Sequence, residues 1–107
     1  MSSSQIKSNL KAARECIAQK DYKKALEITK KILSFEPGNY NAQVFAGVSL
    51  LNLGVYDESE KAYQEAIQLN PANALAWQGL VNLFEKTGDL QKLKDASFSL
   101  ADIYLQR

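Results

Sequence analysis

The sequence predicts an all-α protein built from three stacked helix-turn-helix hairpins. Apolar residues recur at steps of three and four along six segments, which is the spacing of one face of an α-helix. Short polar or glycine-containing breaks separate the two segments of each pair. Pro37 and Pro71 stand 34 residues apart, and each is followed two residues later by an asparagine, Asn39 or Asn73. A fixed period of this length indicates repeated helical hairpins, and 107 residues accommodate three of them in one domain.

The first hairpin is expected over residues 6–39. The apolar face of its first helix is marked by Ile6, Leu10, Ala13 and Ile17. A polar break over residues 19–22 ends that helix. The inner side of the second helix is marked by Ala25, Leu26, Ile28, Thr29, Ile32 and Leu33. This helix stops before Pro37, because the residue preceding a proline is pushed out of the α region.

The second hairpin is expected over residues 40–73, with a break at Gly54 and an end at Pro71. Its two helices are marked by Ala42, Phe45, Ala46, Ser49 and Leu50, and by Tyr56, Ser59, Tyr63, Ala66 and Ile67. Asn39 and Asn73 stand just before the first helices of the second and third hairpins. Asparagine is a favoured N-cap residue, so each is expected to cap the helix that follows it.

The third hairpin is expected over residues 74–107 and breaks at Gly88. Its first helix contains Trp77, which is expected to be a large buried residue. The last helix carries apolar residues at Leu93, Ala96, Leu100, Ile103 and Tyr104. The solvent-facing end of a repeat stack is normally polar. We therefore expect either that the chain is part of a longer solenoid or that two copies pair through this face.

The net charge of +1 conceals two regions of opposite charge. Residues 1–35 carry eight basic and three acidic residues, or +5, and the remainder carries five basic and nine acidic residues, or −4. The lysines at positions 20, 23, 24, 30 and 31 are spread around a helix instead of forming a stripe, so direct contact with RNA is not expected. No apolar run approaches the length of about 18 residues that a helix needs to cross a bilayer. We expect a cytoplasmic or nuclear protein without membrane contact.

Residue types suited to catalysis or metal binding are scarce. The chain has no histidine, and its one cysteine, Cys16, lies on an expected inner helical face without an activating partner. The acidic run at residues 57–60 lacks the glycine and the distant glutamate of a calcium loop. At a helix start such carboxylates interact favourably with the helix dipole. We expect no enzyme, no metal site and no cofactor.

The 34-residue offset also pairs Ala42 with Ala76, Gly54 with Gly88, and Tyr22 with Tyr56. This pattern resembles the tetratricopeptide repeat family. The family's small residue in the first helix falls on Ala13, Gly47 and Val81, and its aromatic residue in the second helix on Thr29, Tyr63 and Ser97. The resemblance implies a right-handed superhelical stack whose groove is lined by the first helix of each hairpin. It also implies that the groove binds peptides from other proteins.

Three longer stretches are more specific: residues 10–26, 39–50 and 75–90. Together they resemble the N-terminal segment of the large tetratricopeptide subunits of superkiller complexes. The resemblance implies a scaffold, an exosome cofactor in cytoplasmic 3′-to-5′ mRNA decay. Its implied partners are a DExH-box RNA helicase, a WD40 repeat protein and a factor that bridges to the exosome. The alternative is a general peptide-binding adaptor that is dimeric through its last helix.

Groove residues follow from the expected first helices. The positions that clamp a chaperone's C-terminal carboxylate in one tetratricopeptide subfamily are occupied here by Leu10, Arg14, Phe45, Leu75 and Gly79, of which only one is basic. Chaperone-tail binding is therefore disfavoured. The remaining partner-binding candidates are Lys7, Arg14, Asn41, Val44, Val48, Asn52, Gln78 and Asn82. This lining suits hydrogen bonds to a peptide backbone, with apolar contacts at Val44 and Val48; the alternative is that these are ordinary exposed helix residues.

Overall fold

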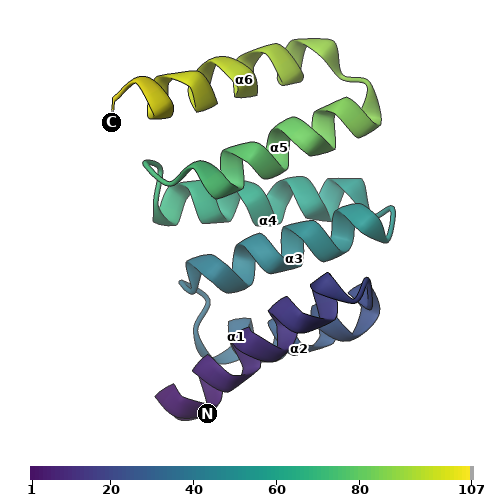
Figure 1. Ribbon diagram of the computed structural model, residues 1–107, viewed down its shortest axis with the longest axis vertical. Helices are drawn as coiled ribbons and strands as arrows, with labels where there is room; N and C mark the ends of the chain where they lie inside the picture. Colours follow the sequence, from purple (N-terminus) through teal and green to yellow (C-terminus); the bar gives the residue numbers. More distant parts are fainter. Residues whose placement is uncertain (107) are drawn as a thin grey trace.

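The computed structural model describes residues 1–106 as six α-helices, which confirms the predicted all-α class. The helices are α1 Ser3–Ala18, α2 Tyr22–Phe35, α3 Tyr40–Asn52, α4 Tyr56–Leu69, α5 Ala74–Thr87 and α6 Leu90–Leu105. Figure 1 shows them stacked in chain order, with α1, α3 and α5 toward the viewer and α2 and α4 behind. Consecutive helices pack against each other along the whole stack, which measures 39 × 30 × 21 Å.

Asparagine side chains cap two of the helices, as predicted. Asn39 accepts a hydrogen bond from the Ala42 backbone N–H at 2.9 Å, and Asn73 accepts one from the Leu75 N–H at 3.0 Å. The first N–H groups of a helix have no partner inside the helix, so each cap satisfies a donor that would otherwise need water. The two Pro-x-Asn sequences are therefore hinges between hairpins.

The start of α4 is stabilised differently. Its N-cap residue, Val55, has no side-chain acceptor, but Asp57 and Glu58 lie in the first turn. Negative charge at this end of a helix interacts favourably with the macrodipole. This is the role predicted for the acidic run.

The turn inside each hairpin contains one residue with positive φ. These residues are Lys20 at 64°, Gly54 at 81° and Gly88 at 75°, and they are 34 residues apart in sequence. Glycine adopts this left-handed conformation freely, whereas a residue with a Cβ atom is strained there. The first hairpin therefore carries strain that the other two avoid.

Tyr63 on α4 occupies the centre of the main core and is only 1% exposed. Its ring packs against two glycines, Gly47 on α3 and Gly79 on α5. A Cβ atom added to Gly47 would come within 2.6 Å of the ring, and one added to Gly79 would come closer still. The two glycines therefore allow one aromatic ring to fill the space between three helices.

Two polar contacts add to this junction. The buried Ser59 hydroxyl donates a hydrogen bond to the Gly47 carbonyl at 2.7 Å, which joins α4 to α3. The Ala76 N–H donates to the Tyr40 hydroxyl at 3.2 Å, which joins α5 to α3. Each contact pairs a polar group at a helix crossing and fixes the register of neighbouring helices.

The prediction that Trp77 is a buried core residue is wrong. Its side chain is half-buried, its Nε1 donates a hydrogen bond to the Pro71 carbonyl at 3.3 Å, and its ring lines a surface hollow. Leu80, Leu83 and Phe84, further along α5, are the large residues of this helix that the core encloses. Trp77 lies instead beside the space between α4 and α6.

The prediction for the open face of the last helix is wrong for four of its five residues, and only Tyr104, at 46% exposure, lies open as expected. Ala96 belongs to the core cluster, Leu93 packs against it, and Leu100 and Ile103 are half-buried. The strongly exposed apolar side chains of α6 are instead Leu90, Phe98 and Leu105 at 76%, 62% and 81% exposure. The apolar positions of α6 therefore occupy two faces, one toward α5 and one toward solvent.

Candidate functional site

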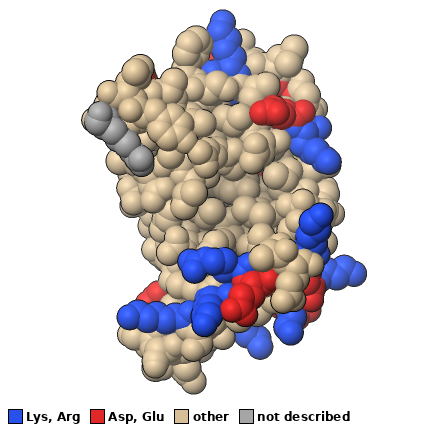
Figure 2. Space-filling model, viewed as in Figure 1, with Lys and Arg blue, Asp and Glu red and all other residues tan. Residues whose placement is uncertain are grey.

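The front helices of the stack form one continuous surface, which we call the inner face. It consists of the sides of α1, α3 and α5 that carry Lys7, Arg14, Asn41, Val48, Asn52, Gln78, Asn82 and Lys86. The α1 helix contacts α3, and α3 contacts α5. No charged residue occurs in α3. Figure 2 shows the resulting uncharged band across the middle of this face, with Lys and Arg gathered near the end formed by the first two helices. A partner crossing the band meets neutral polar and apolar groups.

A hollow of about 410 Å³ lies between the ends of α3 and α5 on this face. Two predicted groove residues, Asn52 and Asn82, line it together. The Asn52 amide donates a hydrogen bond to the Val48 carbonyl of its own helix at 2.8 Å, which orients its carbonyl oxygen. Lys86 and Tyr56 also line the hollow. Two amides beside an ammonium group suit a peptide backbone with a carboxylate.

Lys86 is the site residue that sequence reasoning missed. Gln78 and Asn82 were identified as groove candidates on α5, and a further step of four along the same helix reaches Lys86. The signal for this cation is its spacing, since Lys86 lies one helical turn after Asn82 on the same side of α5.

The other polar candidates are exposed. Lys7 and Asn41 lie on the surfaces of α1 and α3. Arg14 is also exposed, and its guanidinium lies 5.7 Å from the centroid of the Phe45 ring, within the range of a cation–π contact. This contact connects the basic first hairpin to α3.

Two of the candidates have additional structural roles. Gln78 donates a hydrogen bond from its Nε2 to the Tyr104 hydroxyl, which ties α5 to α6. Val48 is half-buried against the main core cluster. Both still present part of their side chains to the inner face.

Val44 departs from its expected position. It is 7% exposed and belongs to the core cluster that contains Tyr63, Ala76 and Leu80. The reason is that helices α4 and α5 cover this side of α3. Val44 therefore supports the floor of the inner face and offers a partner almost no surface.

Three of the five positions of the carboxylate clamp are occupied by side chains or backbone that pack within the stack, whereas Arg14 and Leu75 are exposed. Gly79 lies under the Tyr63 ring, Phe45 lies under the Arg14 guanidinium, and Leu10 packs against a core cluster of the first hairpin. Arg14 is the one basic group among the five positions. That chaperone tails are disfavoured stays a prediction.

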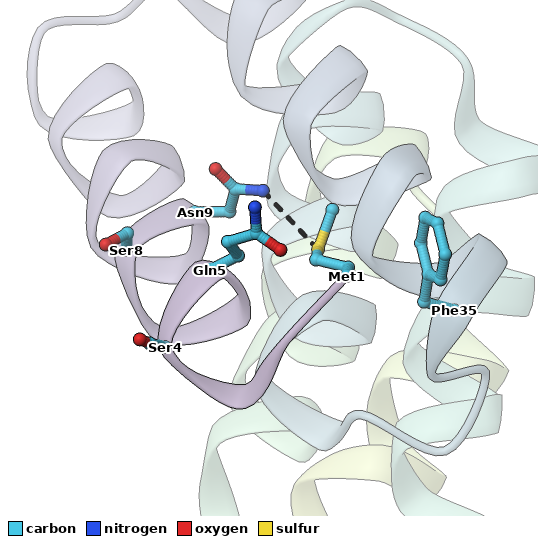
Figure 3. Close-up of a pocket in the computed structure, with 6 residues that line it drawn as sticks. All are labelled: Met1, Ser4, Gln5, Ser8, Asn9 and Phe35. Atoms are coloured by element: carbon cyan, nitrogen blue, oxygen red, sulfur yellow. Dashed lines mark hydrogen bonds between the residues drawn. The ribbon is translucent and has the colours of Figure 1, made fainter.

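A hollow of about 500 Å³ lies at the other end of the stack, beside the start of α1. Figure 3 shows Gln5 and Asn9 pointing toward Met1, with Ser4 and Ser8 directed away from it and Phe35 of α2 on the far side. The Asn9 amide donates to the Met1 sulfur at 3.6 Å. The lining contains no charged side chain, and it shares no residue with the inner face.

Within residues 1–106, no group of three or more His, Cys, Asp or Glu side chains is placed to hold a metal ion. Cys16 is a free, buried thiol, as predicted. No helix in the same range is long and apolar enough to cross a membrane.

Comparison with known sequences identifies the repeat. A tetratricopeptide repeat family model matches residues 40–73. Superkiller complex protein 3 of Homo sapiens is 45% identical over 95 residues, which cover 89% of this chain and 6% of that protein. Superkiller protein 3 of Schizosaccharomyces pombe is 44% identical over 97 residues, 91% of this chain and 7% of that protein. The chain thus spans a small fraction of the length of these relatives.

Solved structures show the same fold at low sequence identity. The translocator chaperone SycD of Yersinia enterocolitica superimposes with a TM-score of 0.92 at 13% identity, covering 99% of this chain and 80% of that one. A tetratricopeptide domain of Spaghetti bound to an HSP90 peptide superimposes with a TM-score of 0.84 at 18% identity, covering 92% of both chains. The chain is therefore a tetratricopeptide repeat protein, and its sequence is similar to a segment of superkiller complex protein 3.

Proposed function

We propose that this chain is a non-catalytic interaction module of a superkiller-type complex, which supports cytoplasmic 3′-to-5′ mRNA decay by the exosome. The observation that carries the proposal is the 44–45% identity to superkiller proteins of human and fission yeast over about nine tenths of the chain. The fold supports a protein-interaction role, because stacked repeats present an extended binding surface. The partners implied are a DExH-box helicase, a WD40 repeat protein and the exosome-bridging factor.

The inner face is the surface that we assign to a protein partner. Its centre is uncharged, and its amides at Asn41, Asn52 and Asn82 are exposed. An extended peptide has unpaired backbone N–H and C=O groups, which side-chain amides can satisfy as donor and acceptor together. Basic groups flank the uncharged centre, Arg14 on α1 and Lys86 at the end of α5. A peptide with a neutral middle and acidic ends matches this arrangement.

Co-purification of the full-length native protein from cells tests the assignment to a superkiller-type complex. The proposal expects the helicase and the WD40 protein to be recovered together with it. Recovery of the protein with neither partner, under conditions that preserve other cytoplasmic assemblies, would contradict the proposal. Recovery from a nuclear fraction alone would contradict the cytoplasmic assignment.

The contribution of the inner face is tested by the double substitution Asn52→Ala and Asn82→Ala in the same experiment. Both side chains are exposed, so the fold is expected to persist. Gln19→Ala with Asn70→Ala is the matched control, because these amides are exposed at the ends of α1 and α4 and lie outside both the inner face and the hollow between α4 and α6. Loss of the partners with the first pair alone supports the inner face. Loss with the control pair alone overturns it.

A second candidate is a peptide-binding adaptor that is dimeric through α6. The observation in its favour is the exposed apolar set of Leu90, Phe98 and Leu105. Light scattering over a wide range of protein concentration distinguishes the two candidates. A mass that doubles with concentration and returns to that of a monomer in Phe98→Glu supports the adaptor. A monomeric mass throughout contradicts it.

A further inference from the structure

Two surface hollows of the molecule occupy equivalent positions in successive repeats. One lies between α2 and α4 with α3 as its floor, and the other lies between α4 and α6 with α5 as its floor. Every residue that lines the first hollow has its counterpart, 34 positions later, in the lining of the second. The same backbone site therefore occurs twice, with different side chains.

The floors of the two hollows differ most. Gln43, Ala46 and Leu50 form the floor of the α2–α4 hollow. Trp77, Leu80 and Phe84 occupy the equivalent positions in the α4–α6 hollow. The volumes are about 250 and 420 Å³ respectively. Only the second falls within the roughly 300–1,000 Å³ of known ligand pockets, which are mostly apolar with a few polar groups.

The aromatic floor of the α4–α6 hollow is held in place by polar contacts. The Lys92 ammonium lies 3.3 Å from the Glu60 carboxylate across the gap between the two helices, and 5.6 Å from the centroid of the Phe84 ring. At the other end, the Trp77 indole donates to the Pro71 carbonyl. The first contact joins α4 to α6 and the second joins α5 to the turn that precedes it, so both ends of the hollow are fixed and an incoming group would not need to order them.

The rim of the α4–α6 hollow has an excess of negative charge. The lining contains two carboxylates and one cation: Lys92 is paired with Glu60, and Asp95 accepts a hydrogen bond only from the neutral Gln91 amide among the contacts of the described residues. The rim of the α2–α4 hollow carries two lysines and two glutamates and is balanced. Charge complementarity favours a cation beside the α4–α6 floor.

We propose that the α4–α6 hollow binds a short extended peptide segment with an apolar side chain next to a lysine or arginine. The lining along α4 runs from Glu60 to Gln68, about 12 Å at 1.5 Å per residue, which matches three or four extended residues at roughly 3.3 Å each. The apolar side chain lies mainly on the half-buried Trp77, and the cation faces Asp95. Leu80 and Phe84, which are 4% and 6% exposed, support the floor beneath Trp77. A helix about 10 Å in diameter and of this length exceeds the available volume.

Trp77 makes the test direct, because it is the only tryptophan of the chain and it lines the hollow. The probe is the acetylated and amidated tetrapeptide Lys-Leu-Leu-Arg, titrated while tryptophan emission is recorded. The comparison peptides are Glu-Leu-Leu-Glu and Lys-Ser-Ser-Arg. We expect a saturable change in emission with the first peptide and at least about tenfold weaker binding of the other two.

Two matched pairs of variants localise the binding. Asp95→Lys reverses the rim charge, and its control, Lys61→Glu, makes the reverse change at the equivalent position of the α2–α4 hollow. Ser99→Phe fills the α4–α6 hollow, and Glu65→Phe is its equivalent control. We expect Asp95→Lys and Ser99→Phe each to weaken binding by about tenfold and the controls to leave it unchanged. Circular dichroism verifies that all four variants are folded.

Three results would overturn the proposal. The first is the absence of a saturable change up to about 5 mM peptide, because binding would then be weaker than about 3 kcal/mol. The second is equal binding of the acidic peptide. The third is a change in emission that depends on protein concentration without peptide, because this would place a second copy in the hollow. None of these measurements involves the inner face, so their outcome is independent of the proposed function.

Discussion

The first and second hairpins use the same positions with different residues. At the helix crossing, Ala13 in the first hairpin corresponds to Gly47 in the second, and the fully buried Thr29 corresponds to the fully buried Tyr63. On the first helix of the following hairpin, Phe45 corresponds to Gly79. Where the second helix carries a large ring, its neighbours are glycines; where it carries threonine, its neighbours are larger.

Each hairpin therefore fills the space where its second helix meets the two neighbouring first helices, which we call a junction, and a different helix supplies the large side chain in each case. Close-packed interiors tolerate exchanges of residue when total volume is preserved. The left-handed turn position differs in the same way, since Lys20 stands where Gly54 and Gly88 stand in the later hairpins.

Tyr63→Thr places the threonine of the first junction in the second junction, where the neighbouring residues are glycines. We expect a loss of about 3–5 kcal/mol in the free energy of unfolding, as for other truncations of buried aromatic residues, because Gly47 and Gly79 leave the space empty. Denaturant unfolding measures it. Adding Gly79→Phe reproduces the volumes at the first junction and should recover part of the loss. If the double variant were no more stable than Tyr63→Thr alone, the idea that one helix can supply the volume lost from another would be wrong.

Gly79→Ala inserts a methyl group against the Tyr63 ring. We expect a loss of about 1–3 kcal/mol from overpacking, despite the better helix propensity of alanine. Gly38→Ala is the control, because its Cβ atom would meet only Leu69, at an ordinary 3.7 Å. In a Tyr63→Thr background the cost should shrink. Equal costs in both backgrounds would show that the ring is not the cause.

Gly54→Lys gives the second hairpin the turn residue of the first. No atom lies within 4 Å of the added Cβ, so the expected loss of about 1 kcal/mol arises from backbone strain at positive φ. Lys20→Gly should change stability in the opposite sense, by less, because glycine also increases the entropy of the unfolded chain. Thermal unfolding of both variants checks this. Stabilisation by Gly54→Lys would contradict the assignment of strain.

Alkaline pH should lower the stability of the second junction, which contains Tyr63, more than that of the first, which contains Thr29. Burial raises the pKa of Tyr63 above the ordinary value of 10.0, so the folded state binds its proton more tightly than the unfolded state. Its stabilising contribution is therefore complete below pH 10 and declines as pH rises above it, by up to about 1.4 kcal/mol per pH unit. Tyr63→Phe should remove most of this decline.

Tyr40 provides the internal comparison at high pH. Burial raises its pKa too, although the hydrogen bond from the Ala76 N–H opposes the rise. Some alkaline destabilisation should therefore persist in Tyr63→Phe and disappear on adding Tyr40→Phe. An unchanged pH profile in the double variant would contradict the account.

Most of the fold was predictable because it depends on periodic features. Helical spacing, the prolines before the hinges and the Asn39 and Asn73 caps are local signals, and the structure contains all of them. Trp77 was misplaced because a sequence period indicates which side of a helix is apolar, but not how far the neighbouring helix extends. Trp77 is incompletely buried because it lines the hollow between α4 and α6, and the spacing of those two helices cannot be inferred from a local sequence pattern.

The site was less predictable than the fold. Asn52 and Asn82 were correctly placed on one surface, because residues on neighbouring first helices share a face. Val44 was expected on that surface but is buried, since its exposure depends on how closely α4 and α5 approach α3. The pairing of the α2–α4 and α4–α6 hollows needed the structure, because each hollow combines three helices.

The most direct test of the central claim, that this chain is a superkiller-type interaction module acting through its inner face, is binding between purified components. The chain is titrated separately against the helicase, the WD40 protein and the exosome-bridging factor by calorimetry. We predict that at least one binds with a Kd of about 10 µM or tighter, and that Asn52→Ala with Asn82→Ala weakens it by about tenfold. No binding to any of the three, or binding that the double substitution leaves unchanged, would contradict the claim.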